Sequence, residues 1–264
     1  MSSAVEQHVI YRIANAPLRE YPYPHFYLES VFPDEFYRSV RKYWPDGASL
    51  VSLADSGRVT PGAYPDRFIL PFTPKKIEKL SKEKRDFWHD FGSWFLGERF
   101  LQALLRKFSS GLQRRFGDAL DRQPFEVDSL IVRDRVNYRL GPHTDATSKV
   151  LSLLFYCPDD DSMKHLGTSI YEPLDPDFRC SGGPHYPHDR FVRVATMDYR
   201  PNSLFAFFKT DNSFHGVEPI IDDGVLRDLL LYDIRVGQMR TPSAEGNRPP
   251  IGWSMLKRIF ARNS

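Results

Sequence analysis

The chain has 264 residues and a formal net charge of +2, from 36 basic and 34 acidic side chains. This length suits one large domain or two small ones. The charge balance gives no electrostatic reason to expect nucleic acid or an anionic membrane as a partner. The longest apolar runs, such as residues 151–157, are too short to span a bilayer. Residues 1–20 lack the layout of a secretory signal, and two cysteines are too few for a disulfide framework, so we expect a cytoplasmic protein.

The N-terminal part of the chain is predicted to be rich in helices. A strand is expected over residues 25–29, followed by a helix for which Pro33 suits the first turn. Residues 46–73 contain recurring Gly and Pro and are expected to be irregular. From residue 73 to about residue 115, large apolar side chains recur at three- and four-residue steps, which is typical of helices that pack on a core.

After Gly117 the sequence changes to short β-rich segments separated by Gly, Pro, Asp and Asn. Their spacing indicates an antiparallel sandwich or barrel, with the preceding helices buttressing it. Residues 175–190 interrupt these segments and are predicted to be a surface insertion of the kind that often acts as a lid. We therefore expect a single domain over 1–264, made of a helix-rich support in 1–117, a β core in 118–237 and a C-terminal tail in 238–264. Within the tail, the segment 253–264 is expected to be a surface-packed terminus, with a short basic helix as the alternative.

A histidine and a carboxylate stand one residue apart in YRLGPHTDATSKV, residues 138–150. Because side chains alternate faces along an extended segment, His143 and Asp145 are expected to point the same way. Alone, the pair is compatible with a polar loop, an acid/base couple or two arms of a metal site. His215, in TDNSFHGVEP, is the best candidate for a third ligand, because polar residues and a glycine flank it where a strand-like run begins. Two histidines and one carboxylate form the facial triad of non-haem Fe(II) oxygenases.

Arg227 follows His215 by twelve residues, at the head of a predicted strand. Leu229 and Leu231 would continue the same inward face, and an arginine that heads an apolar row needs an anionic partner. Its planar guanidinium suits a carboxylate held by two hydrogen bonds. A dicarboxylic co-substrate could therefore chelate the metal with one end and meet Arg227 with the other.

These residues together resemble the Fe(II)- and 2-oxoglutarate-dependent dioxygenases, in the bacterial prolyl-4-hydroxylase-like branch. The pattern of that superfamily is His-x-Asp, a distal His and then an Arg or Lys, which this chain matches with His143, Asp145, His215 and Arg227. The lead-in YRLGPHTD is similar to a Tyr-bearing strand and glycine turn of the branch, and PHFYLESVFPDEFYRSV is similar to the opening strand and helix of its bacterial members. The resemblance implies a mainly β fold with flanking helices, in which a double-stranded β-helix (jelly roll, cupin-like) is buttressed by N-terminal helices.

The resemblance also implies an enzyme. His143, Asp145 and His215 would hold Fe(II), and Arg227 and Tyr138 would contact 2-oxoglutarate, with O2 as the second co-substrate. The reaction implied is hydroxylation of a small-molecule or polymer-linked substrate with release of succinate and CO2. Where some relatives place a serine two residues after the arginine, this chain has a leucine, so Tyr138 is the obvious hydroxyl to assist Arg227. A protein or peptide hydroxylase, a non-catalytic metal-binding cupin-like protein, and a cupin-like hydrolase or isomerase are the alternatives.

Five further residues have simpler interpretations beside functional ones. His185 and His188 resemble a second metal pair, but no carboxylate set completes a site, so exposed loop positions are favoured. Arg67 could reach an acidic substrate, although a surface position is favoured. Lys149 could replace Arg227 as the carboxylate partner, and His25 is expected to be structural.

Overall fold

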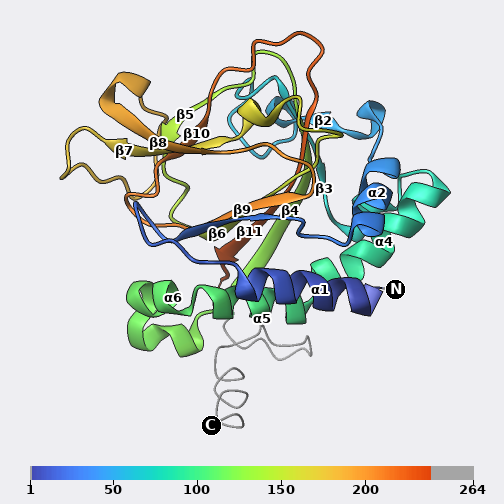
Figure 1. The fold of residues 1–264 in the computed structure, drawn as a ribbon, viewed down its shortest axis with the longest axis horizontal. Helices are drawn as coiled ribbons and strands as arrows, with labels where there is room; N and C mark the ends of the chain where they lie inside the picture. The colour runs from blue at the N-terminus through green and yellow to red at the C-terminus, as the bar shows by residue number, and fades with distance from the viewer. Residues whose placement is uncertain (1, 239–264) are drawn as a thin grey trace.

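The computed structural model describes residues 2–238, and its strands form two antiparallel sheets (Figure 1). Within these residues the larger sheet has seven strands, in the order β1 (His25–Glu29), β9 (Ser203–Phe208), β6 (Lys149–Tyr156), β11 (Arg227–Val236), β4 (Phe125–Asp134), β3 (Arg67–Pro71) and β2 (Val51–Ser52). The smaller sheet has four, in the order β5 (Leu140–His143), β10 (His215–Val217), β7 (Thr168–Pro173) and β8 (Phe191–Met197). The expectation of a mainly β protein with flanking helices is confirmed.

Helices cover the outer face of the larger sheet. The described helices are α1 (Ser2–Asn15), α2 (Asp34–Lys42), α3 (Pro74–Ile77), α4 (Lys82–Phe95), α5 (Glu98–Lys107) and α6 (Ser109–Phe116). In Figure 1, α1, α5 and α6 lie along one side of the larger sheet, opposite the smaller sheet. Apolar side chains from one face of each helix join those from the outer face of β6, β9 and β11 in a single core cluster. The predicted helical region from residue 73 to 115 is confirmed as α3 to α6, whereas α1 was not predicted.

The prediction that the segment 46–73 is irregular is wrong for residues 67–71, which form β3, and for the two-residue strand β2. β3 pairs with β4 over five residues, from Arg67 opposite Asp134 to Pro71 opposite Leu130. The pairing partner lies far away in the sequence, and its hydrogen bonds outweigh the local signal from Gly and Pro. As a result, the side chain of Arg67 turns toward the interior of the molecule.

The inner faces of the two sheets enclose a second core and a cavity. Apolar side chains from β3, β4, β6, β9 and β11 pack there against those from β7 and β10. β11 lies in the middle of the larger sheet, between β4 and β6. Alternate residues of β11 face the smaller sheet, in the row Arg227, Leu229, Leu231, Asp233 and Arg235. This row forms the floor on which the site is built.

The predicted terminal segment 253–264 and most of the predicted tail lie outside the described residues. Between residues 2 and 238, the helices are all too short or too polar to cross a bilayer.

Candidate metal centre

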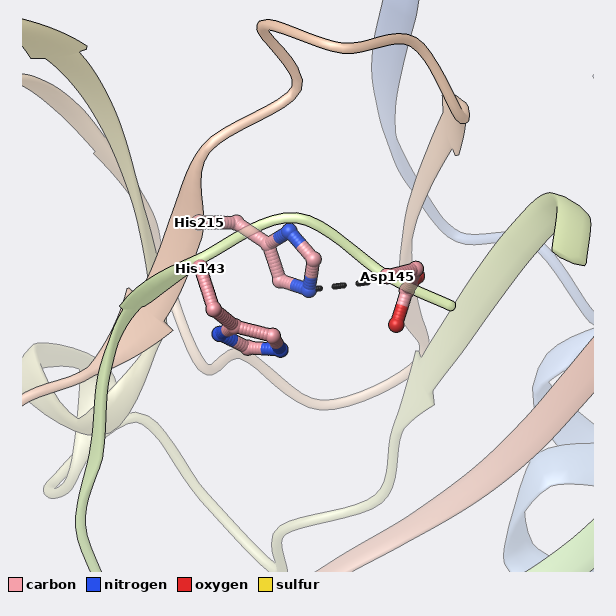
Figure 2. Close-up of side chains that lie close together, drawn as sticks. All are labelled: His143, Asp145 and His215. Atoms are coloured by element: carbon pink, nitrogen blue, oxygen red, sulfur yellow. Dashed lines mark ion pairs between the residues drawn. The ribbon is translucent and has the colours of Figure 1, made fainter. Parts of the chain in front are cut away.

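The three predicted metal ligands meet at one edge of the smaller sheet. His143 ends β5 and His215 begins β10, and the two residues face each other directly across this antiparallel pair. Asp145 lies just beyond β5, in the segment that leads to β6. Figure 2 shows the three side chains turned toward one another. One potential ligand atom from each lies within 4.8 Å of the others, and His215 Nε2 is 4.0 Å from Asp145 Oδ2.

Both imidazoles are oriented by the backbone so that Nε2 is left for a metal. His143 Nδ1 donates to the carbonyl oxygen of Gly141 at 3.0 Å, and His215 Nδ1 donates to that of Ser213, also at 3.0 Å. Since a carbonyl only accepts, these bonds fix the tautomer that carries a lone pair on Nε2. Burial lowers the pKa of His215, and burial together with the neighbouring His215 lowers that of His143 well below its usual range. Both rings are therefore neutral, as a metal ligand must be.

The carboxylate of Asp145 is held in its charged form. Its Oδ1 lies 2.9 Å from Lys149 Nζ, and its Oδ2 accepts a hydrogen bond from Ser152 Oγ at 2.7 Å. Burial alone would raise the pKa of Asp145, but the charge of Lys149 and the hydrogen bond from Ser152 outweigh burial, and the pKa lies well below its usual range. Two neutral imidazoles and one carboxylate on one side of an open space suit a divalent cation such as Fe(II).

A cavity of about 600 Å³ opens over these ligands. The sheet register defines its two ends. Arg67 is opposite Asp134 on β4, and Asp134 is in turn opposite Arg227 at the start of β11, so Arg67 marks one end. Lys149 is opposite Arg235 near the finish of β11 and marks the other. Tyr138 and Thr168 line the cavity with Arg67, while Asp233 and Arg235 line it with Lys149.

At the first end, two guanidinium groups share one buried carboxylate. Arg227 points inward, as expected, but it does not line the cavity: its side chain is fully buried and its NH1 donates to Asp134 Oδ2 at 2.7 Å. Its Nε donates to the Leu166 carbonyl oxygen at 2.7 Å, and its NH2 donates to Thr168 Oγ1 at 3.3 Å. Arg67 also grips Asp134, through bonds of 2.7 and 2.9 Å. Two cations against one anion leave a net positive charge at this end of the cavity.

This arrangement differs from two expectations. The carboxylate partner of Arg227 in the structure belongs to the chain itself, because β11 and β3 flank β4 and bring both arginines to Asp134. Arg67, for which a surface position was favoured, is largely buried and lines the cavity, because β3 places it next to Asp134.

Tyr138 supplies a hydroxyl at the same end. Its ring lies against the Arg67 guanidinium, whose carbon is 4.3 Å from the ring centroid. The hydroxyl oxygen is buried and has no hydrogen-bond partner within residues 2–238. Burial raises the pKa of Tyr138, so the hydroxyl keeps its proton and remains a donor. A buried donor without an acceptor is costly, and here it fits a ligand that supplies one.

Two loops that line the cavity are joined by a hydrogen bond. The hydroxyl of Tyr64, which lies between β2 and β3, and His185 Nε2, in the segment 174–190, share a hydrogen bond of 3.1 Å. That segment is tied to the metal motif: Thr144 Oγ1 donates to the Cys180 carbonyl oxygen at 2.7 Å, and the Tyr186 amide donates to the Pro142 carbonyl oxygen at 2.9 Å.

His185 and His188 are exposed, as expected. In the part of the chain that the structure describes, the three-ligand cluster that could hold a metal contains neither of them.

Sequence reasoning missed Asp134 and Asp233. Asp233 shares the parity of Arg227, Leu229 and Leu231 along β11, so extending the inward row by two residues would have found it. Asp134 carries no comparable signal, because its role depends on which strands flank β4.

No family model matches this chain, and no curated protein matches it. Several solved structures are similar. HygX from Streptomyces hygroscopicus, solved with nickel and 2-oxoglutarate bound, shares 12% identity with a TM-score of 0.47, over 80% of this chain and 82% of that one. A Pseudomonas putida prolyl-4-hydroxylase shares 14% identity with a TM-score of 0.47, over 90% of this chain and 100% of that one. The α-ketoglutarate-dependent epimerase SnoN from nogalamycin biosynthesis shares 12% identity with a TM-score of 0.47, over 89% and 82%. At these scores the likenesses identify no function for this chain.

Proposed function

We propose that the chain is an Fe(II)- and 2-oxoglutarate-dependent dioxygenase, with O2 as its other co-substrate. We also propose that its two sheets form a double-stranded β-helix within one domain over residues 1–264. The observation that carries the proposal is the convergence of His143, Asp145 and His215 beneath an open cavity. Each of the three side chains is held in the charge state that a metal ligand requires. Bound iron would supply the activation of O2 that couples decarboxylation of 2-oxoglutarate to oxidation of a second substrate.

The protein's own contribution begins with the ligand set. The Nε2 atoms of His143 and His215 and a carboxylate oxygen of Asp145 would hold the ion. Lys149 and Ser152 keep the carboxylate charged and fixed in place. The apolar side chains of Leu154 and Val217 line the cavity and limit the access of water, which strengthens every charge interaction inside it.

The co-substrate would lie between the metal and the end of the cavity marked by Arg67. Its distal carboxylate would accept the hydrogen bond that the Tyr138 hydroxyl does not make within the protein. The surplus positive charge of Arg67 and Arg227 around Asp134 would attract it. Direct contact between Arg227 and the carboxylate remains a prediction, and it requires the side chains at Asp134 to move. Lys149 is less suited, because two carboxylates already neutralise it.

The second substrate is proposed to be a small molecule or a group carried on a polymer, and hydroxylation is the proposed outcome. The alternative is a protein or peptide hydroxylase with the same iron site. Tyr64 and His185, which both line the cavity, are joined by a hydrogen bond, and this link across the cavity lining favours the smaller substrate.

The direct test uses the purified protein under anaerobic conditions. Isothermal titration should show one site for Fe(II), and 2-oxoglutarate should bind only after the metal. On admission of O2, succinate should form. His215→Ala should remove metal binding, while His188→Ala, which changes an exposed loop histidine, should leave it unchanged. A wild-type protein that binds neither metal nor 2-oxoglutarate would refute the proposal, and metal binding without succinate formation would favour a non-catalytic metal-binding protein.

A further inference from the structure

The end of the cavity opposite Arg67 contains a carboxylate that the proposed reaction does not use. We propose that Asp233 is a substrate-specificity residue that binds a hydroxyl group of the second substrate, so that the substrate is an alcohol or a polyol. This inference rests on the proposed oxygenase function and adds the chemical class of the substrate.

Asp233 is 6% exposed, and its two oxygens are treated differently by the fold. Oδ2 lies 3.0 Å from Lys149 Nζ and 3.4 Å from Arg235 NH2. Oδ1 is also buried, yet it has no hydrogen-bond partner among the residues that the structure describes. Leaving a buried carboxylate oxygen unsatisfied costs free energy, so a group that fills this position from the cavity is expected.

The position of Asp233 relative to the metal site suits a substrate rather than the co-substrate. Asp233 lies six positions after Arg227 along β11, which corresponds to roughly 20 Å of strand. In the other direction, a single side chain connects it to the metal ligand Asp145: Lys149 lies 2.9 Å from one carboxylate and 3.0 Å from the other. A molecule bound at Asp233 would therefore have its neighbouring carbon atoms close to the metal ligands and away from the Arg67 end.

The surrounding charges define what Asp233 can bind. The cations at this end already have carboxylate partners, because Lys149 pairs with Asp145 and Asp233, and Arg235 pairs with Asp128 at 3.3 Å. The buried side-chain atoms left without a hydrogen bond at this end, within the described residues, are Arg235 Nε, a donor, and Asp233 Oδ1, an acceptor. Oδ1 would repel a phosphate or a carboxylate on the substrate. A hydroxyl group suits it in either protonation state, since it donates to a carboxylate and accepts from a carboxylic acid.

The test compares matched ligands on matched variants. The protein is loaded with Ni(II) and 2-oxoglutarate, and binding of a panel of monosaccharides and their deoxy counterparts is measured by isothermal titration. The test variants are Asp233→Leu and Asp233→Asn, the second of which keeps the side-chain shape if the first does not fold. The control is Asp128→Asn, because Asp128 lies on the same sheet and pairs with Arg235 but does not line the cavity.

A sugar that binds the wild type should lose roughly tenfold to a hundredfold in affinity when the hydroxyl that meets Asp233 is replaced by hydrogen. This difference should disappear in Asp233→Leu, shrink in Asp233→Asn and persist in Asp128→Asn. Equal affinities for hydroxy and deoxy ligands, a difference that survives in Asp233→Leu, or no binding by any sugar would each overturn the inference. Failure of the proposed function is separate, because it would appear as loss of Ni(II) or 2-oxoglutarate binding in the wild type. The same sugar comparison on the metal-free protein then still tests Asp233.

Discussion

Arg227→Met is expected to destabilise the protein more than it weakens 2-oxoglutarate binding. Both partners of the Arg227–Asp134 pair are 0% exposed, and the guanidinium also satisfies the Leu166 carbonyl oxygen. Removing one member of a buried pair costs about 3–5 kcal/mol. Arg67 keeps its two bonds to Asp134, so the carboxylate is not left alone, and we expect the lower bound of about 3 kcal/mol. For a protein of this size that corresponds to a fall in Tm of roughly 6–12 °C.

The assay is chemical denaturation of wild type and variant, followed by circular dichroism, with 2-oxoglutarate affinity measured on the same samples. Asp134→Leu combined with Arg227→Met is the informative companion, because removal of both charges should recover part of the lost stability. The reasoning would be refuted by a variant that unfolds within about 0.5 kcal/mol of the wild type while its affinity for 2-oxoglutarate falls more than tenfold. That result would make Arg227 a ligand of the co-substrate, not a support for the fold.

Three further outcomes are expected. Tyr138→Phe should weaken 2-oxoglutarate binding by roughly two- to tenfold in titration calorimetry. The Tm of this variant should not fall, because the Tyr138 hydroxyl has no hydrogen-bond partner within the described chain. A lower Tm would contradict that account. His143→Ala should abolish the rise in Tm that Fe(II) produces in the wild type, and a preserved rise would place the metal elsewhere. Gly182→Ala should lower the free energy of unfolding, measured with denaturant, by more than about 1 kcal/mol. The reason is that Gly182 has a φ of +139° and that a Cβ there would lie 2.9 Å from the Asp145 carbonyl oxygen. An unchanged free energy of unfolding would show that the loop adapts freely.

The parts of the molecule that follow from local sequence were predictable. The first strand lies at residues 25–29 as expected, and the helical periodicity after residue 73 was borne out. The convergence of His143, Asp145 and His215 was predictable because His143 and Asp145 alternate along one segment, and because polar residues set His215 apart at the start of its strand. These signals span a few residues each, and no long-range pairing is needed to read them.

The parts that depend on strand order were not predictable. β3 forms only because β4, almost sixty residues later, offers it a partner, so its Gly- and Pro-rich surroundings misled the local reading. The same pairing brings Arg67 and Arg227 to Asp134, and no pattern in the sequence connects these three residues. The inward orientation of Asp233 was predictable from the alternation of side chains along β11. The lack of a hydrogen-bond partner for its Oδ1 among the described residues was not, because it depends on which side chains the fold places around it.

The central place of β11 in the larger sheet has a consequence for biosynthesis. Its two neighbours, β4 and β6, are translated about a hundred and about eighty residues earlier. The edge of each strand that pairs with β11 stays unpaired until β11 has left the ribosome. Nascent chains that end before Arg227 would therefore present two long strands, each with an open edge, which is the situation that recruits chaperones and favours aggregation. Since loop closure over such separations is slow, the folding of this core is expected to be rate-limited by the insertion of β11.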